Sequence, residues 1–166
     1  MSRIKSLLTT DAFKTLYYSL IFPYIQYCIL AWGTAGKTVL NPLVVIQKRT
    51  VRMMSNVGQL DHTHLLFKNL DILKLNDVHK HEVIKFIHNE ISNPVIFDFI
   101  QVGQIHGHNT RRRNDLRPPR YKSRLSKRFI TYHGCKIWND TPQTIRNIVN
   151  KTTLKIRSKK YMLNLY

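Results

Sequence analysis

Three His-x-His pairs have the residue types and the spacing that most resemble those of metal ligands. They are His62/His64, His79/His81 and His106/His108. Residues two apart on a helix point about 200° apart, so His79 and His81 cannot share one ion. No third or fourth ligand follows at a spacing typical of zinc. We therefore expect no metal site, and we interpret these histidines as ordinary surface residues, some of them at helix ends.

The residues give no support for a catalytic centre. Asp and Glu number nine, and none forms an Asp-Asp or Asp-x-Asp pair that could hold magnesium. Cys28 and Cys135 are far apart, and no CxxC, GxSxG or phosphate-binding glycine loop occurs. We expect no catalytic residue and no cofactor in this chain. Reduced thiols and the lack of a recognisable secretion signal favour an intracellular protein, nuclear or cytoplasmic and not secreted.

The strongest functional signal is positive charge in the second half of the chain. The formal net charge is +18; residues 1–101 hold 11 basic and 7 acidic residues, and residues 102–166 hold 16 and 2. Such a balance implies an anionic partner, most often nucleic acid. Arginine forks match phosphate oxygens in two-point contacts. The predicted phosphate-binding residues are Arg111, Arg112, Arg113, Arg117, Arg120, Lys122, Arg124, Lys127 and Arg128.

Aromatic side chains are interleaved with this basic run or follow it. They are Tyr121, Phe129, Tyr132 and Trp138, which could stack on bases or simply pack. A second, smaller group of basic residues lies on a helix predicted to start at Asn41-Pro42 and to end near residue 56. Gln47, Lys48, Arg49 and Arg52 are its candidate backbone-phosphate contacts, and a solvated basic face is the simpler alternative.

The elements that position these residues are predicted to be mainly α-helical. Asp11 should cap a first helix, with Leu16, Leu20, Tyr24 and Tyr27 on its buried face. Further helices are expected over residues 63–70, 76–91 and 152–166. Residues 102–128 should form an irregular basic segment with room for a short strand pair, and residues 129–132 a short strand.

Residues 15–36 contain no charged side chain and are long enough to span a bilayer. Pro23 lies near the middle of this run and should break or kink a helix there. A buried pair of helices is therefore the favoured interpretation. The alternative is a membrane-associated basic protein that uses this run together with its basic C-terminal residues.

The residues assembled so far resemble a known family. Residues 16–27 (LYYSLIFPYIQY) and 31–33 (AWG) resemble the segment after the palm in reverse transcriptases of non-LTR (jockey-like or LINE-type) retrotransposons. Residues 46–52 (IQKRTVR) are similar to the family's LQKRAIR helix, and the likeness continues through residues 62–63, 66–67 and 70–75. Thr110-Arg111 resembles its TR element, and residues 138–142 (WNDTP) its WNxLP element, with Thr141 in place of leucine.

By this resemblance, residues 1–57 correspond to a thumb-like helical bundle, residues 58–101 to a helical connector and residues 102–166 to a basic C-terminal region. It implies RNA-directed DNA synthesis by the parent enzyme, with RNA and DNA as partners of low sequence specificity. The palm, with its metal-binding aspartates and Mg²⁺, is absent, so the chain should be inactive alone. We expect a truncated or decayed copy opening at Met1; a retrotransposon remnant without selected function is a further alternative.

Overall fold

The computed structural model describes residues 9–105 and 110–166, and helices dominate them. The predicted mainly α fold is confirmed. In chain order the elements are α1 (Thr10–Leu16), the π-helical turn η2 (Tyr17–Ile21), α2 (Phe22–Gln26), α3 (Ile29–Trp32), α4 (Lys37–Met54), α5 (His64–Asn69), α6 (Leu75–Ser92), α7 (Val102–Ile105), the 3₁₀ turn η3 (Ser126–Arg128), α8 (Ile130–Asp140), α9 (Gln143–Arg146) and α10 (Lys151–Asn164).

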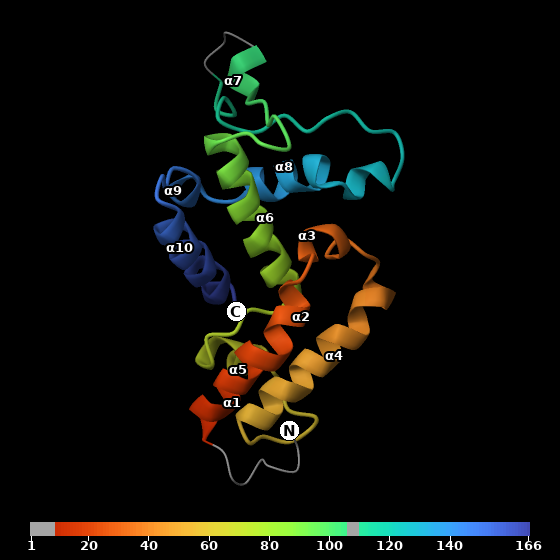
Figure 1. Cartoon of the computed structure of the whole chain (residues 1–166), viewed down its shortest axis with the longest axis vertical. Coiled ribbons are helices and arrows are strands. Elements are labelled where there is room, and N and C mark those ends of the chain that lie inside the picture. The colour runs from red at the N-terminus through yellow and green to blue at the C-terminus, as the bar shows by residue number, and fades with distance from the viewer. Residues whose placement is uncertain (1–8, 106–109) are drawn as a thin grey trace.

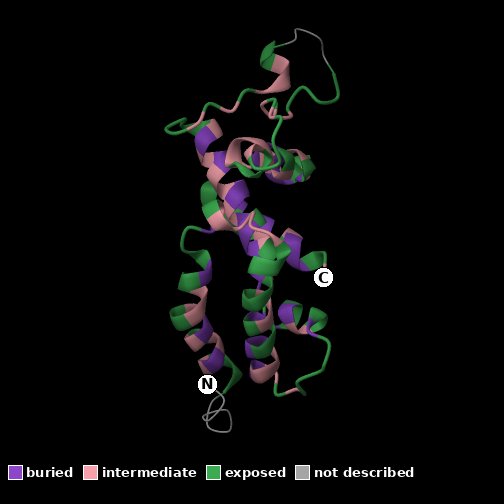
Figure 2. Ribbon diagram, turned by 90° about the vertical axis from the view of Figure 1, so that its right-hand side faces the viewer, coloured by how far each residue is buried: buried purple, intermediate pink, exposed green. Residues whose placement is uncertain are grey.

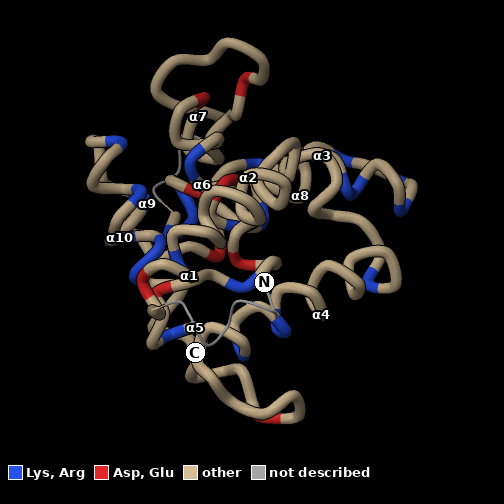
Figure 3. Tube along the Cα trace, turned by 60° about the horizontal axis from the view of Figure 1, so that its bottom comes forward, with Lys and Arg blue, Asp and Glu red and all other residues tan. Residues whose placement is uncertain are grey.

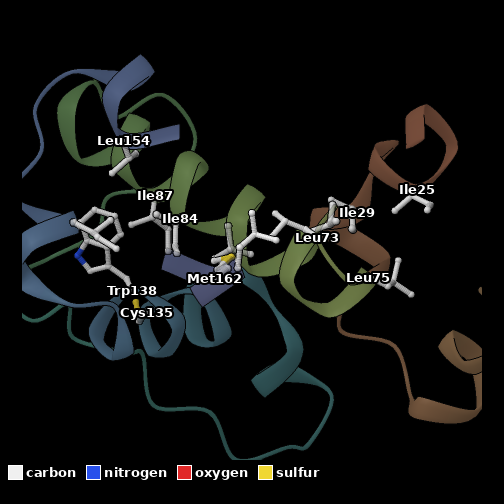
Figure 4. Packing of buried hydrophobic residues seen from close by; sticks show 14 of the residues in the cluster. Ile25, Ile29, Leu73, Leu75, Ile84, Ile87, Cys135, Trp138, Leu154 and Met162 are labelled. Carbon is white, nitrogen blue, oxygen red and sulfur yellow. The ribbon is translucent and has the colours of Figure 1, made fainter. Parts of the chain in front are cut away.

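Helix α6 is the central element of the molecule. In Figure 1 it runs along the long axis, with α1, α2 and α4 towards one end and α7 and α8 towards the other. α8 and α10 pack directly on α6. Figure 2 shows that buried residues occur along the helices throughout the molecule. The main core gathers around α6 and includes Ile84, Ile87, Trp138 and Leu154 (Figure 4).

The first helical segment does not bury the face that its spacing predicts. Leu20, Tyr24 and Tyr27 are 56%, 82% and 76% exposed, whereas Tyr17 and Ile25 are buried. The turn η2 has the wider i→i+5 pattern, which rotates the following residues away from an ideal α-helical stripe. Capping also differs from the prediction, because the Thr9 hydroxyl, and not Asp11, accepts the N–H of Ala12.

The uncharged run at residues 15–36 is divided among four short elements. Cys28 adopts a left-handed backbone with φ 50°, and this bend separates α2 from α3. The Trp32 indole N–H donates to the carbonyl of Tyr27 across the bend, at 2.7 Å. Among the described residues, none of the helices combines the length and the apolar character that crossing a bilayer requires.

Helix α4 begins four residues before its predicted start at Asn41. Gly36 takes the extended N-cap conformation, and Pro42 lies within the helix. Pro42 removes one backbone hydrogen bond near the helix start, and the early turn buries Leu40 against the core, which offsets that loss. The helix ends at Met54, close to its predicted end.

Gln47 is buried, which corrects its prediction as a nucleic-acid contact. Its amide nitrogen donates to the Tyr17 hydroxyl and to the Leu73 carbonyl, both at 2.9 Å. Its amide oxygen accepts the N–H of Leu75, also at 2.9 Å. Gln47 therefore joins η2, α4 and the start of α6, and burial raises the pKa of the Tyr17 phenol that it contacts.

Replacing Gln47 with leucine should lower the free energy of unfolding by about 3 kcal/mol. The change leaves the Leu75 N–H and the Leu73 carbonyl buried without a partner, at about 1–3 kcal/mol for each such group. Urea unfolding followed by circular dichroism measures the loss. Gln143→Leu is the matched control because Gln143 is exposed on α9. A loss below 1 kcal/mol for Gln47→Leu would contradict the bridging role.

The three histidines of α6 are core residues, which corrects the interpretation of His79 and His81 as surface residues. His79, His81 and His88 are each no more than 6% exposed. The His79 ring stacks on His133 of α8, with 5.6 Å between centroids, and it also lies against Gly33, where an added Cβ would be 2.2 Å from its ring. Only glycine allows this approach, so Gly33 serves packing.

The remaining histidine contacts are also internal. His81 Nδ1 lies 3.0 Å from the Ser158 hydroxyl of α10, and His88 Nε2 donates to the Ile148 carbonyl at 2.7 Å. Across residues 9–105 and 110–166 no three His, Cys, Asp or Glu side chains cluster as a metal site would require. The pair His106/His108 lies outside the described residues.

Candidate nucleic-acid interface

The predicted basic segment, defined here as residues 110–128, is an irregular connection between α7 and α8 that ends in the 3₁₀ turn η3. It passes from α7 to the start of α8 at one end of the long axis (Figure 1). Apart from the single β-bridge between Gln101 and Leu116, no β pairing occurs in the described chain, so the predicted strand pair is absent. All nine predicted cations are exposed: Arg111, Arg112, Arg113, Arg117, Arg120, Lys122, Arg124, Lys127 and Arg128.

Asn139 of α8 anchors the basic segment at Leu116. Its side-chain oxygen accepts the Leu116 N–H and its side-chain nitrogen donates to the Leu116 carbonyl, both at 2.8 Å. The Leu116 side chain is only 1% exposed and packs in the main core. This two-point clamp fixes the backbone between the arginines at 111–113 and those at 117–120. The sequence pattern gave no sign of the contact, because the partners are 23 residues apart.

The backbone next to Leu116 is held on its other side by residues 100–103. Val102 donates to the Asp115 carbonyl, and Arg117 donates to the Ile100 carbonyl, each at 2.9 Å. Gly103 donates to the Arg113 carbonyl at 2.9 Å, and a Cβ on Gly103 would be 2.3 Å from the Arg113 side chain. The segment is thus an ordered platform for its arginines.

The single acid of the basic segment is neutralised by a residue from outside it. Asp115 forms a 2.8 Å ion pair with Arg146 of α9, and both side chains are largely buried. None of the nine predicted cations forms an ion pair with a carboxylate in the part of the chain that the structure describes. Their charges therefore face solvent together and favour an anionic ligand.

For the aromatic residues, which were expected either to stack on bases or to pack, the structure decides between the two at Trp138. Trp138 is 4% exposed and belongs to the main core, so its ring is not available for stacking on a base. Phe129 is the N-cap of α8, and residues 130–132 are helical, which corrects the predicted short strand. Tyr121 lies near Phe129 and Tyr132, with ring centroids 6.5 and 6.2 Å away.

The basic residues of α4 form a separate and smaller patch. Lys48 and Arg49 are exposed, while Arg52 is half-buried and its Nε donates to the Asp61 carbonyl at 2.8 Å. At 100° per residue, Lys48 and Arg52 leave the helix within 40° of each other, on the side away from Val39 and Ile46, whereas Arg49 lies between the two sides. Figure 1 places this part of α4 at the opposite end of the molecule from the basic segment. The structure therefore does not join the two predicted groups into one surface.

Helix α10 supplies further cations that were not among the predicted site residues. Lys151, Lys155, Arg157 and Lys160 are exposed, and Lys159 pairs with Asp71 at 2.5 Å. Asn150 caps this helix by accepting the N–H groups of residues 152 and 153. Figure 3 shows the basic residues spread over several elements and the acidic residues confined to a few positions.

The buried acid of α6 has a structural role. Glu90 is 3% exposed, and one carboxylate oxygen accepts the N–H groups of Phe97, Ile96 and Val95 at 2.9–3.3 Å. These bonds, led by the one from Phe97, hold the pKa of the Glu90 carboxyl below its ordinary value. They fix the chain where it leaves α6.

Comparisons with family models, with curated proteins and with solved structures gave no match. What the described residues present is an exposed, anchored row of cations without acidic partners. Phosphate is the anion that arginine forks fit best.

Proposed function

We propose that this chain binds nucleic acid through the phosphates of the backbone, with little preference for sequence and without catalysis of its own. The observation that carries the proposal is the row of nine exposed cations on residues 110–128, whose single acid, Asp115, is already paired. Phosphate contacts of this kind position a nucleic acid but transmit little sequence information. The exposed Lys48 and Arg49 of α4 add a second contact.

The resemblance to non-LTR retrotransposon reverse transcriptases gives this proposal a biological setting. In that setting the helices before residue 58 hold a primer–template duplex, and the basic segment grips template RNA or target DNA. Several residues of the resembling motifs serve packing in the structure: Gln47 and Trp138 are buried, Gly33 contacts His79, and Asn139 clamps Leu116. Motif residues that serve packing are compatible with a non-catalytic fragment of such a polymerase, because they maintain the fold and do not take part in chemistry.

Replacing Arg111, Arg112 and Arg113 with glutamine should weaken binding to RNA and DNA alike by about tenfold or more at 100 mM salt. Each lost phosphate contact also lowers the steepness of the salt dependence by about one unit. Filter binding with a mixed-sequence single strand and a duplex measures both effects. The matched control replaces Lys37, Lys68 and Lys80 with glutamine, an equal charge change on other exposed sites. Equal losses in the two triple variants would reject the basic segment as the binding surface.

A further inference from the structure

A pocket of about 390 Å³ opens beside the anchored part of the basic segment. Three parts of the chain form it: residues 98–105, residues 117–121 and one side of α8. Its volume lies near the lower end of the range for small-ligand sites, about 300–1,000 Å³. The pocket is therefore large enough for a flat ring system and too small for a helix or a folded partner.

The walls of the pocket are mostly apolar and are held in place. Phe99, Ile100, Pro119 and Tyr121 line it. The Tyr121 hydroxyl lies 3.2 Å from the Thr131 hydroxyl of α8, and the two share a hydrogen bond. Ile100 is fixed through its carbonyl, which accepts the Arg117 N–H. An aromatic ring with a defined orientation, next to apolar walls, is the usual surface on which a nucleobase stacks.

The floor of the pocket is neutral. Cys135 is 1% exposed, and its thiol donates to the Thr131 carbonyl at 2.9 Å. Burial raises the pKa of this thiol to about 11, so that it stays protonated. An uncharged ring can enter such a site without meeting a buried charge.

The rim of the pocket is charged. Arg117 and Arg120 line it from the basic segment, and both are exposed without a carboxylate partner in the described residues. Asp98 is the one acid at the rim. A phosphate that follows a bound ring would lie on the arginine side, and the Asp98 carboxylate can accept a hydrogen bond from an amino group of the ring. Apolar walls with a cationic rim match a nucleotide.

We propose that this pocket takes up one unpaired nucleobase of a single strand, whose phosphates lie on Arg117 and Arg120. This inference rests on the proposed function and deepens it, because it makes single-stranded RNA or DNA the preferred ligand. A paired base inside a duplex cannot reach the pocket, so a duplex gains only the phosphate contacts.

Tyr121→Ala should weaken binding of a single-stranded 12-nucleotide RNA by about 5- to 150-fold, the range for one stacked base. Binding of a duplex of the same length should be unchanged. Fluorescence anisotropy at 100 mM salt measures both constants. The matched control is Tyr27→Ala, which removes an exposed tyrosine outside the pocket. A single strand in which every base is replaced by an abasic residue tests the same idea on the unaltered protein, whether or not Tyr121→Ala folds.

The outcomes are distinguishable. Selective loss with Tyr121→Ala and with the abasic strand supports the base pocket. Equal affinities for the single strand, the duplex and the abasic strand would overturn the pocket while leaving phosphate binding intact. Failure of the unaltered protein to bind any nucleic acid at 50 mM salt would overturn the proposed function, and the base pocket with it.

Discussion

Raising the salt concentration from 50 to 200 mM should weaken nucleic-acid binding by a factor of about 10³ to 10⁵. Phosphate contacts release condensed counterions, and each contact contributes about 0.9 to the slope of log affinity against log salt on duplex DNA. The basic segment presents nine exposed cations, so between six and nine contacts predict a slope of about −5 to −8. This is the largest effect that we expect for this protein.

The measurement is a series of binding isotherms at four or more salt concentrations, with RNA and DNA of unrelated sequences. The slope should be nearly the same for every duplex sequence, because the contacts are to the backbone. The variant lacking Arg111, Arg112 and Arg113 should have a slope shallower by about three. A slope near zero for the unaltered protein would show that the cations of the basic segment do not contact phosphates.

The exposure of these nine cations could be predicted from the sequence, but the contacts that hold the backbone of the basic segment in place could not. A dense run of arginine and lysine has no way to be buried without many carboxylates, and the chain has few. The contacts that shape the run come from distant positions, such as Asn139 to Leu116 and Arg146 to Asp115. Such pairs leave no local pattern in a single sequence.

Helix prediction succeeded where periodicity and chain breakers agreed. α5 begins directly after Thr63, α6 ends at Ser92 before Asn93-Pro94, and α10 covers the predicted C-terminal helix. It failed at the first helix, because the π turn η2 depends on tertiary packing around Tyr17 and shifts the buried face. The pattern of polar and apolar residues also gave no indication that His79 and His81 are buried, because the helices that cover them, α8 and α10, lie far away in the sequence.

Gln47 shows why residue type alone misplaced one candidate site residue. A polar residue beside Lys48 and Arg49 looks like part of a basic face, but on the helix it points 100° away from Lys48 and 160° away from Arg49. This direction places it with Leu40, Val51 and Met54 on the buried side of α4. The buried Gln47 amide has hydrogen-bond partners only because three polar groups from other parts of the chain lie next to it there.

Lowering the pH from 7.5 to 5.0 should reduce the free energy of unfolding by about 4 kcal/mol. Burial is the main cause that lowers the pKa of both His79 and His81 from 6.5 to about 4. The unfolded chain therefore takes up protons at a higher pH than the folded chain. The contribution of the two neutral histidines to the free energy of unfolding is fully present above pH 6.5. It is lost as the pH falls from 6.5 towards 4, and the loss at pH 5 is about 2 kcal/mol for each histidine.

The charges around the two rings act in the same direction as burial, with one exception. His79 meets His133 and Lys80, and His81 lies near Lys85, Lys155 and Lys159, while Glu82 opposes the shift. Burial also lowers the pKa of His133, which stacks on His79, so a proton on either ring disfavours a proton on the other. A loss of about 4 kcal/mol is a large part of the 5–15 kcal/mol that stabilises most domains.

Urea unfolding at pH 7.5, 6.5, 5.5 and 5.0, followed by tryptophan fluorescence, tests this prediction. The midpoint should fall with pH while the dependence on urea concentration stays constant. Replacing His79 and His81 together with glutamine should lower stability at pH 7.5 and flatten its pH dependence, because neither new side chain titrates. His62→Gln is the matched control, since His62 is exposed. His79 and His81 are buried where α8 and α10 pack on α6. If the unaltered protein were most stable near pH 5, protonation of these two histidines would not be what destabilises the fold in acid.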